Sequence, residues 1–168
     1  MQAELFVLRI IHIVGGVFWV GAVTFQAFFL FPAVAEAGPA GGQVMQGLVK
    51  RKLLTWLPVT AVVMMLAGLR LLQRAASGIP GYYSTPAGMT YSITGALAIL
   101  MFIHGVTVAR PAAIRMAEVS KAMGAPEADK AALGAEMKKL QIKVAFNLKI
   151  TAAMLLVAAV GMAIARYL

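Results

Sequence analysis

Two histidines are the residues of this chain best suited to chemistry. His12 and His104 are its only histidines, and each lies in a long apolar stretch. Ionisable and metal-ligating side chains are costly in hydrocarbon, so those found there usually serve a function. A neutral imidazole nitrogen is a common axial ligand of haem iron and a good ligand of copper. We therefore expect both histidines to be metal ligands, for haem b in the first place and for copper as the alternative.

Small and aromatic residues share the predicted helical face of His12. Gly15, Gly16 and Trp19 lie within about 60° of it, because each residue turns a helix by about 100°. Two adjacent glycines predict a flat slot in which a macrocycle could lie, with Trp19 packing against its edge. The alternative is that the glycines only allow close helix packing and that His12 is hydrogen-bonded to lipid or to a loop.

His104 lies among apolar residues and is followed by Gly105. An unpaired imidazole is poorly satisfied in such surroundings. This favours a metal ligand over a hydrogen bond to a neighbouring carbonyl or to Thr107.

The depths of the two histidines in the membrane differ. A rise of about 1.5 Å per residue places His12 about 30 Å and His104 about 9 Å from the inner face. One haem held between both histidines is therefore not expected. Met162 and Met154 fall at depths of about 22 Å and about 10 Å, so each histidine could pair with a methionine as the second axial ligand.

The other residue types limit which metal ligands and catalytic groups the chain can offer. The chain has 11 methionines, which suggest copper handling through thioether ligands. They show no repeated Met-x-x-Met spacing, so we interpret most of them as flexible core filling. The chain has no cysteine, which excludes thiolate sites. No carboxylate lies within a predicted span, so we assign no catalytic residue.

The composition requires lipid around these residues. Hydrophobic residues make up 61% of the 168 residues and charged residues 12%, against roughly 45–50% and about 25% in soluble domains. A soluble enzyme is thereby excluded. A membrane-spanning helix needs about 20 mostly apolar residues. Four stretches qualify, at approximately residues 6–34, 50–74, 87–110 and 145–167.

We predict an all-α fold, an integral membrane four-helix bundle in one transmembrane domain of residues 1–168. The connection between the first two spans should turn at the glycines of residues 38–42 and start the second helix early. Residues 111–144 should form a cytoplasmic helical hairpin between the third and fourth spans. Gly124, Ala125 and Pro126 break this hairpin, and Glu127 and Asp129 favour a new helix start.

The basic residues predict the orientation. With four spans, the side that holds both termini carries four lysines and arginines and the other side eleven. The more basic side is cytoplasmic by the positive-inside rule, so both termini lie outside, in our expectation at a bacterial inner membrane. The net charge of +9 is then explained by topology and anionic lipid, and nucleic acid is not an expected partner.

Several short motifs resemble those of the HemJ-type protoporphyrinogen oxidase and copper-resistance CopD group of small four-helix membrane proteins. His12 is followed by Trp19 seven residues later in the first span. The second span has a basic entry at residues 50–52 and ends in Ala-Gly-Leu at residues 67–69. His104 precedes a glycine late in the third span, and Phe-Asn opens the fourth at residues 146–147.

This resemblance covers nearly the whole chain and implies a four-helix bundle that binds a b-type haem. For the HemJ type it also implies oxidation of protoporphyrinogen IX. It carries over to His12, Trp19, His104 and Asn147. The chain departs from the HemJ pattern because residues 87–109 contain no lysine or arginine, and its hairpin is longer.

The leading hypothesis is a b-type haem-binding membrane protein that acts in electron transfer or as a haem-bearing subunit of a membrane complex. Three alternatives stay open: an accessory subunit without a cofactor, a copper-handling protein, and a HemJ-like oxidoreductase. The expected partners are the lipid bilayer and either a larger membrane complex or a second copy of the chain.

Overall fold

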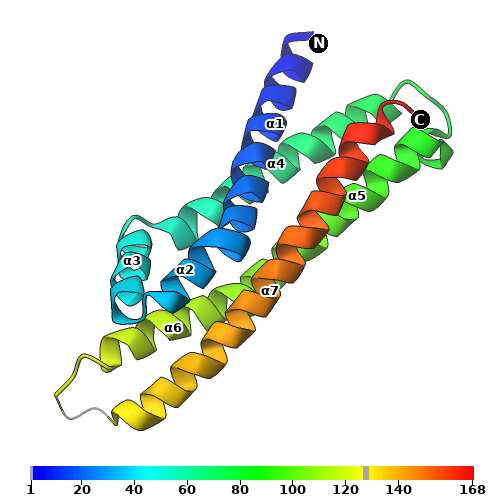
Figure 1. Cartoon of the computed structure of the whole chain (residues 1–168). Helices are drawn as coiled ribbons and strands as arrows, with labels where there is room; N and C mark the ends of the chain where they lie inside the picture. Colours follow the sequence, from blue (N-terminus) through cyan, green and yellow to red (C-terminus); the bar gives the residue numbers. More distant parts are fainter. Residues whose placement is uncertain (1, 127–128) are drawn as a thin grey trace.

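The computed structural model of the chain is helical along nearly all of its described length, residues 2–126 and 129–168 (Figure 1). Its elements in chain order are α1 (Gln2–Phe25), the π-helical turn η1 (Gln26–Leu30), α2 (Phe31–Glu36), α3 (Pro39–Lys50), α4 (Leu53–Ala76), the 3-10 turn η2 (Tyr82–Ser84), α5 (Pro86–His104), the π-helical turn η3 (Gly105–Ala109), α6 (Arg110–Ala122) and α7 (Lys130–Ala165).

Within the described residues, four helices are long and apolar enough to cross a membrane, as predicted. Their bounds are Gln2–Glu36, Leu53–Ala76, Pro86–Ala122 and Lys130–Ala165. The first and third of these are continuous through their π-helical turns. Both chain ends and the connection between α4 and α5 lie at one end of the bundle, called here the terminal end (Figure 1). The opposite end carries α3 and the α6–α7 connection, and is called the hairpin end (Figure 1).

The connection between the first two long helices differs from the expected early start of the second. Gly38 turns the chain with a φ of 54°, and α3 follows as a separate helix. Lys52 then takes the left-handed conformation, with a φ of 60°. A left-handed residue cannot continue a right-handed helix. The second long helix therefore begins at Leu53 and not near residue 50.

A helical hairpin forms where one is predicted, from α6 and the first half of α7. Arg115 of α6 pairs with Glu136 of α7 at 2.7 Å. Asp129 caps α7, because its carboxylate accepts hydrogen bonds from the backbone N–H groups of residues 131 and 132 at 3.1 and 3.0 Å. The predicted contribution of Glu127 lies outside the described residues.

Each of two long helices contains a π-helical turn shortly before a proline. The turn η1 precedes Pro32, and η3 precedes Pro111. A proline inside a helix lacks the N–H group, and its ring clashes with the carbonyl four residues earlier. The wider π-helical turn accommodates this mismatch, so each helix continues past its proline.

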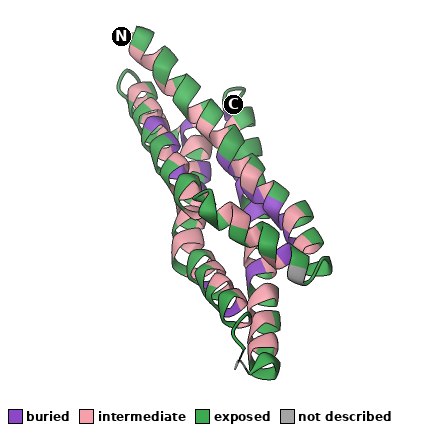
Figure 2. Cartoon of the chain, turned by 90° about the vertical axis from the view of Figure 1, so that its left-hand side faces the viewer, coloured by how far each residue is buried: buried purple, intermediate pink, exposed green. Residues whose placement is uncertain are grey.

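Small residues bring the long helices together. The central core contains five alanines from the four helices, packed around larger side chains that include Trp19, Met64 and Leu155. Alanine allows close approach of helix backbones, as is usual between membrane helices. Large apolar side chains instead cover the outside, where Phe6, Val17 and Phe29 are each at least 65% exposed. Exposed residues follow the outer faces of the helices (Figure 2), which suits contact with lipid.

Candidate functional site

The imidazole of His12 is hydrogen-bonded to the facing helix. Its Nδ1 lies 2.8 Å from the backbone carbonyl oxygen of Met64 in α4. A carbonyl only accepts hydrogen bonds, so Nδ1 carries the proton of the neutral ring and Nε2 keeps its lone pair. A histidine that ligates a metal usually donates its other N–H group in this way, often to a backbone carbonyl.

Gly68 makes room for this imidazole. A Cβ atom at position 68 would lie 2.6 Å from Cε1 and 2.7 Å from Nδ1 of His12. These separations are far below van der Waals contact, so a side chain here would displace the ring. Gly68 therefore packs directly against His12, a contact that the sequence analysis did not predict. The available signals were its place in the Ala-Gly-Leu motif at residues 67–69 and a glycine within an apolar span, which on its own indicates close packing as much as a site.

Two ion pairs fix the same pair of helices at the terminal end. Glu4 of α1 pairs with Arg70 of α4, with Nε and Oε1 3.0 Å apart, and also with Arg74. The groups are partly exposed, so each pair contributes little stability on its own. Arg70 follows Gly68 by two residues, so the ion pairs support the register that places His12 on Gly68.

The glycines beside His12 face the side chain of Met64. A Cβ atom at Gly15 would lie 2.7 Å from Met64 Cβ, and one at Gly16 would lie 3.7 Å from Met64 Sδ. Met64 therefore fills the space next to Gly15 that the sequence suggested as an open slot. Of the two explanations for these glycines, close helix packing applies to Gly15.

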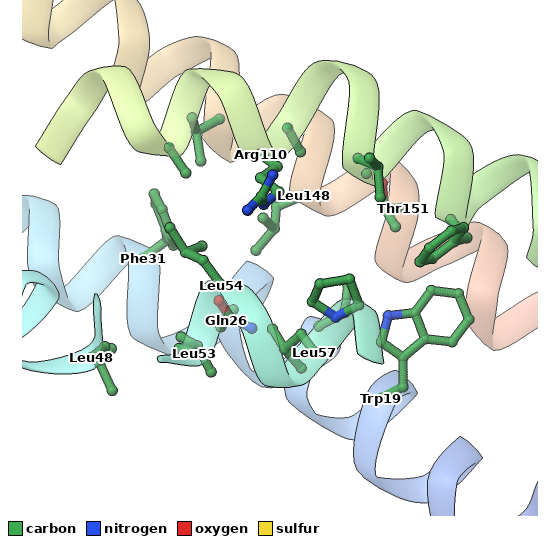
Figure 3. A pocket seen from close by; sticks show the side chains of 18 of the residues that line it. Trp19, Gln26, Phe31, Leu48, Leu53, Leu54, Leu57, Arg110, Leu148 and Thr151 are labelled. Atoms are coloured by element: carbon green, nitrogen blue, oxygen red, sulfur yellow. The ribbon is translucent and has the colours of Figure 1, made fainter. Parts of the chain in front are cut away.

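Trp19 lies away from His12, in the centre of the bundle. It is 5% exposed, and its ring packs edge-on against Phe102 of α5 with centroids 6.3 Å apart. Seven residues separate it from His12, or about 10 Å along the helix. Trp19 thus lines a half-open apolar cavity near the hairpin end (Figure 3) and does not flank the imidazole of His12.

His104 contacts a different helix pair. Its Nδ1 lies 3.3 Å from the hydroxyl oxygen of Thr151 in α7. The Thr151 hydroxyl donates to the carbonyl of Asn147 at 2.9 Å, so it accepts from the His104 N–H group. Thr107, considered above as a partner, donates instead to the Ile103 carbonyl at 2.8 Å.

Asn147, to which the resemblance extends, uses its side chain within its own helix. Its amide nitrogen donates to the Lys143 carbonyl at 2.7 Å. This side chain therefore serves α7 and is not directed to either histidine by any hydrogen bond among the described residues.

The structure does not bring the two histidines together. His12 lies seven residues before Trp19, and His104 lies two residues beyond Phe102, the ring that Trp19 contacts. Both helices run from the terminal end to the hairpin end (Figure 1). The separation along the bundle is therefore about 13 Å. One iron cannot take both imidazoles as axial ligands.

The methionines considered as second ligands lie on α7. Met154 follows Thr151, the contact of His104, by three residues and is 38% exposed. Met162 follows Gly161, where a Cβ atom would lie 2.3 Å from Thr94 of α5. His12 contacts α4 instead. These contacts therefore do not place either methionine as a second axial ligand beside His12.

Within residues 2–126 and 129–168, no three histidine or acidic side chains gather into a potential metal site. The chain matches no protein-family model, no curated protein and no solved structure. The chemistry available at the site therefore has to be judged from the two imidazoles and their surroundings.

Proposed function

We propose that the chain is an integral membrane protein that binds one b-type haem through His12. The observation that carries this proposal is the hydrogen bond from Nδ1 of His12 to the Met64 carbonyl at 2.8 Å. It orients the imidazole and leaves the Nε2 lone pair for iron, within a helix long and apolar enough to cross a membrane.

The residues present would supply a ligand nitrogen for a haem at this position. The imidazole is half-buried between α1 and α4, so it is held by both helices and still accessible from the side. A macrocycle bound there would have to lie on the accessible side of the helix pair, because Met64 fills the space next to Gly15. His12, Gly68 and the Met64 carbonyl would hold the ligand nitrogen, and a haem bound there supplies one-electron chemistry.

His104 fits this role less well. Its contact Thr151 lines the apolar cavity near the hairpin end, but His104 itself does not line that cavity. We assign to His104 a packing role between α5 and α7.

In this proposal the protein lies in a bacterial inner membrane with both termini outside, as the basic residues at the hairpin end favour. It acts in electron transfer or as the haem-bearing subunit of a membrane complex. The resemblance of its histidine motifs to the HemJ and CopD group supports haem binding.

Copper is the second candidate ligand, because the thioether of Met64 lies beside Gly16 on the side of α1 that carries His12. A thioether with an imidazole is a soft donor set that suits copper.

The absorption spectrum and the metal content of the purified protein test the proposal together. We expect a Soret band, α and β bands on reduction, and iron without copper after expression with sufficient haem supply. Copper without iron would select the second candidate. A protein with neither metal, even after exposure to haem and copper, would be left with the role of an accessory subunit.

A further inference from the structure

An apolar cavity that is about half open to its surroundings lies toward the hairpin end of the bundle (Figure 3). Its lining is mostly aliphatic and aromatic, with Trp19 at one end and the exposed Arg110 nearer the other. Phe102, also in the lining, packs against Trp19. Figure 3 shows the Arg110 side chain directed into the space between α4 and α7. The cavity is thus apolar along most of its length and carries one permanent positive charge.

Both π-helical turns contribute to the cavity wall. Gln26 belongs to η1, and Gly105, Val106 and Ala109 belong to η3. π-Helical turns inside α-helices occur frequently at functional sites. Gly105 has open space where a Cβ atom would lie, so the wall stays open at this turn.

Arg110 has no carboxylate partner in the part of the chain that the structure describes. The ion pairs found there belong to Arg70, Arg74 and Arg115. A guanidinium is always protonated and presents five N–H donors, a geometry that matches a carboxylate or a phosphate. The guanidinium lies next to apolar side chains, so the ligand that suits both is an anion attached to an apolar group.

We propose that this cavity binds a single-chain amphiphilic anion. Its carboxylate or phosphate headgroup pairs with Arg110, and its apolar chain runs toward Trp19. Phe102, which Trp19 contacts, lies eight residues before Arg110, so the chain has about 12 Å of helix to follow. This site is separate from the proposed haem site at His12.

Fluorescence of Trp19 tests this proposal in the full chain. The only other tryptophan, Trp56, is 59% exposed and outside the cavity lining, so Trp56→Phe leaves Trp19 as the single emitter. Stearic acid with a nitroxide at mid-chain is titrated into the apoprotein in a neutral detergent. We expect saturable quenching that unlabelled stearate reverses, and binding at least about tenfold weaker for the uncharged methyl ester.

Arg110→Gln should weaken binding of the acid by the same factor without weakening the ester. Lys143→Gln is the matched control, because Lys143 is exposed, lies next to the cavity residue Val144 and does not line the cavity. It should leave both affinities unchanged. The comparison of acid with ester in the unsubstituted cavity remains decisive even if Arg110→Gln fails to fold.

A labelled lysophosphatidylglycerol, compared with a labelled lysophosphatidylcholine, distinguishes a single-chain lipid headgroup from a free fatty acid. Saturable quenching by lysophosphatidylglycerol assigns a lipid, and quenching by stearate alone assigns a fatty acid. Equal affinities for acid and ester, or quenching that only rises in proportion to the detergent-phase concentration of every probe, would overturn the proposal.

Discussion

Replacing His12 with alanine is expected to remove the Soret band from the purified protein, whereas His104→Ala retains it. The reason is that Nε2 of His12 is the proposed iron ligand, while His104 contacts Thr151 and does not line the apolar cavity. Haem content per chain, measured as the pyridine haemochrome, quantifies the difference. The His104 substitution should cost about 1 kcal/mol of stability through its lost hydrogen bond.

Free imidazole provides the control for folding of the His12→Ala protein. It can enter the space that the side chain vacates and supply the missing nitrogen. Recovery of the Soret band on its addition would show that the helices still assemble. A His12→Ala protein that keeps a full complement of haem would contradict the assignment, as would loss of haem from His104→Ala alone.

Gly68→Ala is expected to lower haem affinity by about 10- to 100-fold without removing the ligand, the range typical when a residue that orients a metal ligand is changed. The new methyl group would lie 2.6 Å from Cε1 of His12 if nothing moved, so the ring must leave its position and its hydrogen bond to Met64. The dissociation constant for haem measures the effect.

Gly21→Ala is the matched control for this substitution. Gly21 also lies in a long apolar helix, but no atom is within 4 Å of the position that its Cβ would take. The haem affinity of this variant should equal that of the unsubstituted protein, and its melting temperature should not fall, because alanine is the better helix former. If Gly68→Ala binds haem as tightly as Gly21→Ala, the packing of His12 on Gly68 has no role in haem binding.

The apolar stretches of the sequence predict the long helices well, because hydrocarbon requires about 20 apolar residues per span whatever the contacts between helices. The same stretches do not predict the breaks. The separate helix α3 depends on the left-handed backbone of Lys52, and the π-helical turns depend on how each helix accommodates a following proline. Apolar periodicity does not predict these local backbone conformations.

The candidate site is only partly predictable for a similar reason. The sequence identifies His12 as an unusual residue in a span, and counting helical rise already separates it from His104. It does not show which helix His12 faces. The Met64 carbonyl and the space above Gly68 therefore emerge only once α1 and α4 are packed together.

Residues that share one predicted helical face can also have different neighbours once the helices are packed together. Trp19 was expected to pack beside a macrocycle at His12, but it packs against Phe102 and lines the apolar cavity near the hairpin end. The face of α1 that carries both residues thus packs against α4 near the terminal end. Closer to the hairpin end, the same face points into the centre of the bundle.

Titration of the apoprotein with haem, followed at the Soret band, tests haem binding at His12 most directly. The proposal predicts a clear end point at one haem per chain for the unsubstituted protein and for His104→Ala, and no end point for His12→Ala. An end point at two haems per chain, or the same titration curve for all three proteins, would contradict it.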